Sequence, residues 1–182
     1  MALNATIYTF EISLNDADRR VFEGLSLRIA RHPSETEEYL LTRVLAYCLE
    51  FTEGIAFSKG LSEPDAPALA IRDLTGALKS WIEIGSPDAA RLHKAAKAAP
   101  RVAVYSHKNV AALVERLAQD RPHRAAAIEF HAIDRELIAA LAARLDRRMA
   151  FDLAVAERHL YVTVGGETLA GMVEPYRIPP AG

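Results

Sequence analysis

The sequence contains little cysteine and no long apolar segment, and each absence excludes a class of protein. Cys48 is the only cysteine among 182 residues, so one chain can form neither an internal disulfide nor a cysteine-ligated zinc site. No apolar run approaches the roughly 18 residues needed to cross a bilayer. The N-terminus lacks the basic start and apolar run of a signal peptide. We therefore expect a cytoplasmic protein with no membrane partner.

Sequence motifs for common cofactor and hydrolase sites are also missing. The chain has no GxGxxG, GxxxxGK[ST] or GxSxG segment, which removes the usual signals for dinucleotide, nucleotide and serine-hydrolase sites. Its six histidines show neither HxxxH nor HExxH spacing, so no zinc site is indicated. Cys48 lies in an apolar helical stripe, as expected for an inert core thiol. Acidic and basic side chains remain as the candidates for chemistry.

Charge is distributed unevenly along the chain. The formal net charge is −2, which argues against a dedicated, high-affinity nucleic-acid binder. Residues 1–90 contain 8 Lys/Arg and 14 Asp/Glu, whereas residues 91–148 contain 12 and 6. This division is expected of a metal site beside a phosphate-attracting surface, and also of two solvated faces of an ordinary domain.

The length and the hydrophobic patterns predict one domain of the α/β (α+β) class over residues 1–182. Apolar residues alternate over 8–14 and 25–29, as in two strands that each bury one face. A helix is expected to begin at Ser34, because Ser34 and Glu37 have the spacing of a capping box. The buried stripe of this helix contains Leu41, Val44, Leu45 and Cys48.

Residues 34–106 form the predicted core, in the order helix, three strands, helix, strand. Thr75-Gly76 predicts a hairpin between two of these strands, and Ser86 is expected to cap the second helix. Further elements are expected to complete a central mixed β-sheet flanked by helices, with a C-terminal antiparallel meander. The proline-rich tail 175–182 is expected to lie over the surface.

This αβββαβ order resembles the core of the PD-(D/E)XK nucleases. In that superfamily two acids on neighbouring strands hold Mg²⁺, and a lysine two residues after the second acid helps to orient the attacking water. Glu83 occupies the second acid's place, but Gly85 stands where the lysine would be. The hairpin register places Ala68 opposite Glu83, which leaves Asp65 in the preceding loop as the other candidate ligand.

Several segments together resemble the YaeQ family of bacterial proteins, over essentially the whole chain. They are Ala5–Tyr8, Arg31–Thr36, Lys59–Ser62, Asp73–Gly76, Trp81–Gly85, Pro87-Asp88 and His93–Ala95. The resemblance implies a compact variant of the nuclease fold whose lysine comes from the following helix, and it implies no established activity. It identifies Glu83 as the second acid, Lys94 as the displaced lysine and Glu35–Glu38 as the acidic helix start. Ala68 replaces the family's aspartate, which removes an expected metal ligand.

The first functional hypothesis is a Mg²⁺-dependent, nuclease-like hydrolase. Glu83 would be the metal ligand, Glu38 an auxiliary ligand or water-positioning group, and Lys94 the charge stabiliser. Asp65 would be a second metal ligand. The cations expected to contact phosphate are Lys59, Arg91 and Lys97.

The alternative is a non-catalytic protein that binds nucleic acid or the transcription machinery on the same scaffold, and a third interpretation is a cleft for a small anionic ligand. Simpler interpretations also exist for the residues themselves. Glu83 can be an ion-paired strand residue, and Lys94 a solvated lysine. The sequence predicts neither substrate nor oligomeric state.

Overall fold

The computed structural model describes residues 4–58 and 65–182, and within them ten strands form one continuous sheet. The strand order is β2-β1-β8-β9-β10-β7-β6-β5-β4-β3. The strands are β1 (Thr6–Asp16), β2 (Val21–Arg31), β3 (Ile55–Phe57), β4 (Leu69–Arg72), β5 (Leu78–Ile84), β6 (Arg101–Ser106), β7 (Glu129–Ile133), β8 (Arg148–Ala156), β9 (His159–Val164) and β10 (Glu167–Tyr176). The helices are α1 (Glu37–Leu49), α2 (Ala89–Ala98), α3 (Val110–Asp120) and α4 (Arg135–Ala142), with a short 3₁₀ turn at Ala125–Ala127.

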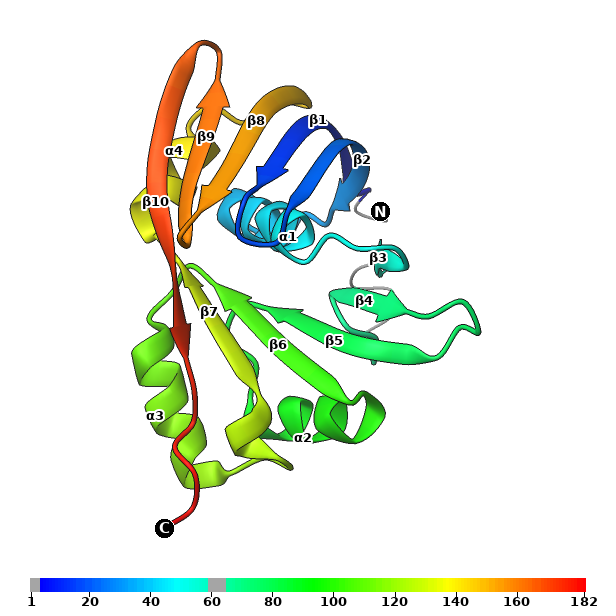
Figure 1. Cartoon of the computed structure of the whole chain (residues 1–182), viewed down its shortest axis with the longest axis vertical. Helices are drawn as coiled ribbons and strands as arrows, with labels where there is room; N and C mark the ends of the chain where they lie inside the picture. Colours follow the sequence, from blue (N-terminus) through cyan, green and yellow to red (C-terminus); the bar gives the residue numbers. More distant parts are fainter. Residues whose placement is uncertain (1–3, 59–64) are drawn as a thin grey trace.

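The sheet bends at β10 and is nearly closed, like a barrel. The first part of β10, Glu167–Met172, pairs with β9, and the last part, Val173–Tyr176, pairs with β7. One strand therefore belongs to both halves of the sheet. Helix α1 lies between the two halves, as Figure 1 shows, with β1, β2 and β8 on one side and β5, β6 and β7 on the other. The result is a mixed α+β fold.

The core follows the period-two pattern of the sequence. Tyr8, Phe10, Ile12 and Leu14 of β1 are buried, and Leu25, Leu27 and Ile29 of β2 are buried beside them, as predicted. The stripe of α1 is buried in the same cluster, including Cys48. Each of these leucine or isoleucine side chains contributes about 2 kcal/mol by leaving water. This burial fixes α1 between the two sheet halves.

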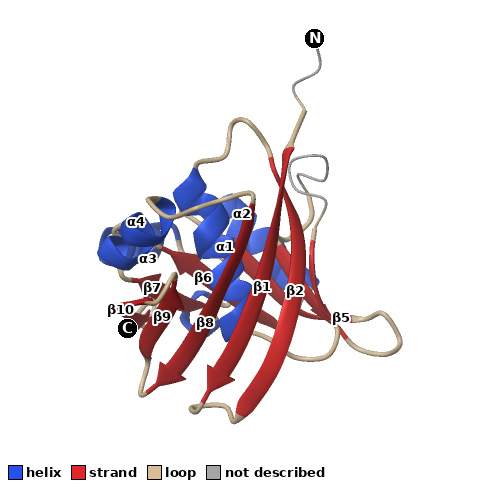
Figure 2. Cartoon of the chain, turned by 90° about the horizontal axis from the view of Figure 1, so that it is seen from above, coloured by secondary structure: helices blue, strands red, loops and turns tan. Residues whose placement is uncertain are grey.

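Helices cover the remaining face of only one half of the sheet. Helices α2 and α3 pack on β5, β6 and β7, where Leu92 and Leu117 join Trp81 and Phe130 in a second cluster. On the other half, the outward face of β1, β2 and β8 carries no helix among the described residues, and Figure 2 shows these strands with the helices on one side only. That half therefore presents a bare sheet face.

Two helix caps and the C-terminal tail differ from the predictions. Helix α1 is capped by Thr36, whose Oγ1 accepts from the Tyr39 backbone N at 3.0 Å, so the predicted cap at Ser34 is wrong. Helix α2 is capped by Asp88 instead of Ser86, because the Asp88 carboxylate accepts from Arg91 N. The tail does not simply lie over the surface, since Ile178 is buried in the second cluster.

The predicted hairpin register is confirmed along most of β4. Leu69 pairs with Ile82 and Ile71 with Ser80, as the Thr75-Gly76 turn predicts, and a bulge then shifts Arg72 onto Leu78. The described part of the chain contains no helix long and apolar enough to cross a membrane.

Candidate functional site

Glu83 lies under helix α2 and is buried, with 5 % of its surface exposed. Strand β5 turns Ile82 and Ile84 toward the core that contains α1, so Trp81 and Glu83 face α2. The indole Nε1 of Trp81 donates to Glu83 Oε1 at 2.7 Å. The guanidinium Nε of Arg91 donates to Glu83 Oε2 at 2.8 Å. Both carboxylate oxygens are therefore engaged by N–H donors.

Arg91 reaches Glu83 from the first turn of α2. Its guanidinium lies 5.7 Å from the centre of the Trp81 ring, and its Nη2 donates to the carbonyl of Ala66 at 2.7 Å. The hydrogen bond to Glu83 raises the pKa of Arg91 above its ordinary value. This geometry makes Arg91 the counter-ion of Glu83 and the residue that ties the loop before β4 to α2.

Asp65 and Lys94 form a second ion pair next to the first. Lys94 Nζ lies 2.5 Å from Asp65 Oδ1, and the two side chains are 50 % and 88 % exposed. The hydrogen bond from Lys94 lowers the pKa of Asp65, and the charge of Arg91 lowers it further. Four of the predicted residues, Glu83, Arg91, Asp65 and Lys94, thus lie together at α2, but they neutralise one another in pairs.

The other predicted residues lie elsewhere. Glu38 belongs to α1, on the opposite face of β5. The pKa of His107 is lowered, mainly by burial, and the charge of Glu38 opposes part of this shift. Lys97 is exposed on α2, without an ion pair among the described residues. Lys59 lies outside the described residues.

The residues at Glu83 do not fit a Mg²⁺ ion. A hard cation needs free carboxylate oxygens, and both oxygens of Glu83 accept from nitrogen donors. Gly85 has φ +96, a conformation that a lysine would rarely adopt, and a Cβ there would lie 3.8 Å from the Tyr39 ring. Over residues 4–58 and 65–182 no three His, Cys, Asp or Glu side chains are grouped to hold a metal. Trp81 and Arg91 instead supply the partners that a metal would have supplied.

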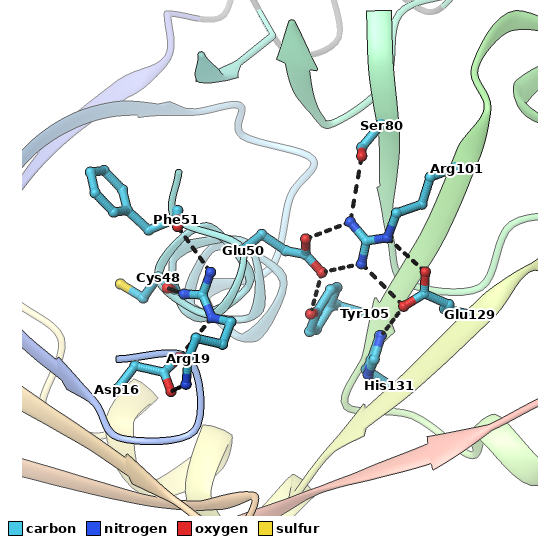
Figure 3. Close-up of polar contacts among 10 residues, drawn as sticks. All are labelled: Asp16, Arg19, Cys48, Glu50, Phe51, Ser80, Arg101, Tyr105, Glu129 and His131. Carbon is cyan, nitrogen blue, oxygen red and sulfur yellow. Dashed lines mark hydrogen bonds and ion pairs between the residues drawn. The ribbon is translucent and has the colours of Figure 1, made fainter. Parts of the chain in front are cut away.

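A second polar cluster, which the sequence analysis did not identify, lies on the core-facing side of the sheet. Arg101, at the start of β6, lies between two carboxylates, as Figure 3 shows. It donates to Glu50 at 2.7 and 2.9 Å through its two Nη atoms, and to Glu129 at 2.6 Å through Nε. Tyr105 donates its hydroxyl to Glu50 Oε1 at 2.6 Å. This cluster joins the end of α1 to strands β6 and β7.

His131 completes the cluster on β7. Its ring stacks on Tyr105 with 4.5 Å between centroids, and its Nδ1 lies 3.2 Å from Arg158 Nη2. Because a guanidinium only donates, Nδ1 accepts, and the proton of the neutral ring is on Nε2, which is 3.5 Å from Glu129 Oε1. His131 and Arg101 together outweigh burial and lower the pKa of Glu129 to about 2.

A cavity of about 370 Å³ adjoins this cluster, between the two halves of the sheet. Besides Glu50, Arg101, Tyr105 and His131, its lining includes Asp16, Asp18, Arg19, Leu49, Val155, Arg158 and Val173. The alternation Arg101, Ala103, Tyr105 was a usable signal, because it puts an arginine on a core-facing position. Its partner Glu50 is 51 residues away in sequence, so no local pattern could pair them.

Comparisons with known proteins agree over nearly the whole chain. The family model described as "YaeQ protein" matches residues 1–172. A protein of Escherichia coli (strain K12) called "Uncharacterized protein YaeQ" is 33% identical over 164 residues, which are 90% of this chain and 91% of the relative. A protein of the same description from Salmonella typhi is 40% identical over 114 residues, 63% of each chain.

Two crystal structures have the same fold. The YaeQ protein from Xanthomonas axonopodis pv. citri superposes with a TM-score of 0.87 at 29% identity, over 96% of this chain and 99% of that one. The YaeQ protein from Pseudomonas syringae gives a TM-score of 0.83 at 31% identity, over 94% and 95%. The match to the family model and the identity to the Escherichia coli relative lead to one conclusion: this chain belongs to the YaeQ family.

Proposed function

We propose that this protein is a non-catalytic nucleic-acid-binding protein built on a PD-(D/E)XK nuclease-like scaffold. The element order from α1 to β6 is helix, three strands, helix, strand, which is the order of the nuclease core. Fold alone does not define chemistry, so the proposal depends on the site.

The state of Glu83 is the observation that carries this proposal. In a metal-dependent nuclease the equivalent carboxylate holds a cation that neutralises phosphate and activates water. Here Arg91 provides the positive charge, the Trp81 indole occupies the other oxygen, and Ala68 contributes no second carboxylate. The acidic site is thereby replaced by a neutral ion pair that stabilises the packing of α2 on β5.

Unpaired cations at the surface favour an anionic partner. Lys97 and Arg116 are exposed on α2 and α3, and Arg28 and Arg148 are exposed on the sheet, each without a carboxylate partner among the described residues. Cations of this kind bind the phosphate backbone and release counter-ions. If the protein acts at the transcription machinery, the proposal is that it contacts the nucleic acid there.

Three measurements on the intact protein test the proposal. Thermal melting with Mg²⁺ or Mn²⁺ is expected to show no stabilisation. A bound metal at 100 times its Kd would raise the free energy of unfolding by about 2.7 kcal/mol. Nicking of plasmid DNA is expected to be absent in the wild type and in Glu83→Ala alike. Filter binding of single- and double-stranded DNA and RNA is expected to weaken steeply as salt rises. Metal-dependent nicking that Glu83→Ala abolishes, or no binding at low salt, would contradict the proposal.

The cavity beside Arg101 favours a second candidate, a binding site for a small anionic molecule. Its volume of about 370 Å³ is within the range of ligand pockets, and Arg158 and His131 lie in its wall. Thermal melting against a panel of small carboxylates and phosphates is the test. A stabilisation that Arg158→Ala removes would support this second candidate, and no stabilisation by any member would exclude it for those ligands.

A further inference from the structure

Three neighbouring strands bring two arginines to either side of one threonine. Thr9 on β1 is directly opposite Arg28 on β2 and directly opposite Arg148 on β8. Tyr8 and Phe10 face the core, so Thr9 and both arginines face outward. Directly opposite residues have Cβ atoms about 5 Å apart, which puts the two arginine stems about 10 Å from each other.

These arginines are not used by the fold. Arg28 and Arg148 are exposed, and neither makes an ion pair or side-chain hydrogen bond to any residue of the described chain. Arg147 adds a third guanidinium to the lining, and its Nε donates to the carbonyl of Ile7 at 3.3 Å. Together Ile7, Thr9, Arg28, Arg147 and Arg148 line an open hollow of about 500 Å³. We call these five residues the arginine hollow.

The charge of the arginine hollow favours an anion. Arg28 and Arg148 lie on strands that flank β1, Arg147 directly precedes β8, and none of the five lining residues is acidic, so three like charges gather without a counter-charge in the lining. Two carboxylates lie near its edges. Glu11, one pair further along β1, accepts from Ser26 at 2.5 Å across the β1–β2 pair, and Asp146 accepts from the Arg147 backbone N at 2.7 Å. The anion site is therefore limited to the end of the sheet at Thr9.

Guanidinium geometry favours an oxyanion, and three guanidiniums together favour the multiple oxygens and charge of a phosphate. The planar fork of arginine matches the oxygens of phosphate or carboxylate in bidentate fashion. The Thr9 hydroxyl donates to the carbonyl of Arg147 at 3.4 Å, so the guanidiniums are the donors that face the hollow. The stems are held by a regular sheet, whose backbone is further fixed by Thr9 N donating to Arg147 O at 2.9 Å. The donors thus extend from a sheet face that no helix of the described residues covers (Figure 2).

We infer that the arginine hollow binds a phosphate group, either of a nucleic-acid backbone or of a small phosphorylated molecule. The nucleic-acid form of this inference rests on the proposed function. In it, the bare face of β1, β2 and β8 is the surface that contacts the nucleic acid. The small-molecule form does not depend on it.

The test compares two double variants of the full chain. Arg28→Ala/Arg148→Ala removes the two flanking guanidiniums, and Lys108→Ala/Arg135→Ala removes the same charge from the starts of α3 and α4 as a matched control. All four side chains are exposed, so both variants should melt near the wild-type temperature. The probes are a labelled 20-nucleotide single strand across a salt series, and inorganic phosphate followed through the Thr9 amide by NMR.

We expect the hollow variant to bind the oligonucleotide at least tenfold more weakly, with a salt slope smaller by about two, while the control changes less than threefold. Inorganic phosphate should shift the Thr9 amide in the wild type and not in the hollow variant. A phosphate shift without oligonucleotide binding would support the hollow for small phosphates and reject the proposed function. Oligonucleotide binding that the hollow variant retains, or equal losses in both variants, would overturn the nucleic-acid form and leave the proposed function standing. If inorganic phosphate also fails to shift Thr9, the whole inference is overturned. No response to either probe would overturn both.

Discussion

Arg91 Nε lies 2.8 Å from Glu83 Oε2, and this contact is the main difference between the site and a metal-binding one. It spans eight residues, from the end of β5 to the first turn of α2. The Trp81 indole holds the other oxygen, so the carboxylate is fixed from two directions. The positive charge beside Glu83 is therefore the side chain of Arg91, in the place where a nuclease would hold a metal ion.

Removing either partner of this pair is expected to destabilise the fold. Glu83→Ala leaves Arg91 facing Trp81 without its counter-ion, and we expect each single variant to lose about 1–3 kcal/mol. Because the two losses share one interaction, Glu83→Ala/Arg91→Ala should lose less than their sum in urea unfolding. The exposed pair Asp65 and Lys94 is the control and should show little coupling. Additive losses at Glu83 and Arg91 would refute the pairing.

Arg101 should matter more for stability than any predicted site residue. Arg101→Met leaves the Glu50 and Glu129 carboxylates without their shared cation. The expected loss is about 3 kcal/mol, the lower end for a broken buried pair, because the Arg101 side chain is 35 % exposed. Tyr105→Phe removes only one hydrogen bond and should cost about 1 kcal/mol. Equal urea midpoints for Arg101→Met and the wild type would show that the cluster contributes nothing.

Glu129 should make stability depend on acid pH. Its pKa is about 2 in the folded chain against 4.5 as the ordinary value, so the folded state favours the charged form. Its contribution is complete above about pH 4.5 and is lost as the pH falls toward 2. Urea midpoints between pH 2 and 6 should therefore fall less steeply for Glu129→Gln than for the wild type. Parallel curves would show that the carboxylate is not held as described.

Cys48 should be unreactive in the folded protein. The side chain is fully buried, and burial raises the pKa of its thiol to about 12, so almost no thiolate exists near pH 8. A disulfide reagent should label one thiol in guanidinium and none under native conditions on the same timescale. Rapid stoichiometric labelling of the native protein would contradict the packing of α1.

Features that depend on local pattern could be predicted from the sequence. The alternation along β1 gave its buried face, the Thr75-Gly76 turn gave the register from Leu69 to Ile71, and Ile82 and Ile84 put Glu83 on the opposite face from themselves. Each of these needs only side-chain period or turn geometry. The family followed from segments spread over the whole chain, and the family model confirmed it.

Features that depend on long-range contacts could not be predicted. The pairing of Arg91 with Glu83 requires the direction in which α2 folds back over β5, and the Arg101 cluster requires the end of α1 beside β6. The bend of the sheet at β10 is equally non-local, since one strand changes partners at Val173. The predicted cap Ser34 instead has its hydroxyl 2.8 Å from His32 Nδ1, and Thr36 accepts from the Tyr39 backbone N.

The single tryptophan provides the most direct test of the account. Its indole N–H donates to Glu83, so the one indole signal in a ¹H–¹⁵N spectrum reports on the carboxylate at 2.7 Å. Mn²⁺ added at one equivalent should leave this signal unbroadened, while Glu83→Gln should shift it. Selective loss of the Trp81 signal at stoichiometric Mn²⁺ would show a metal at Glu83 and contradict the account.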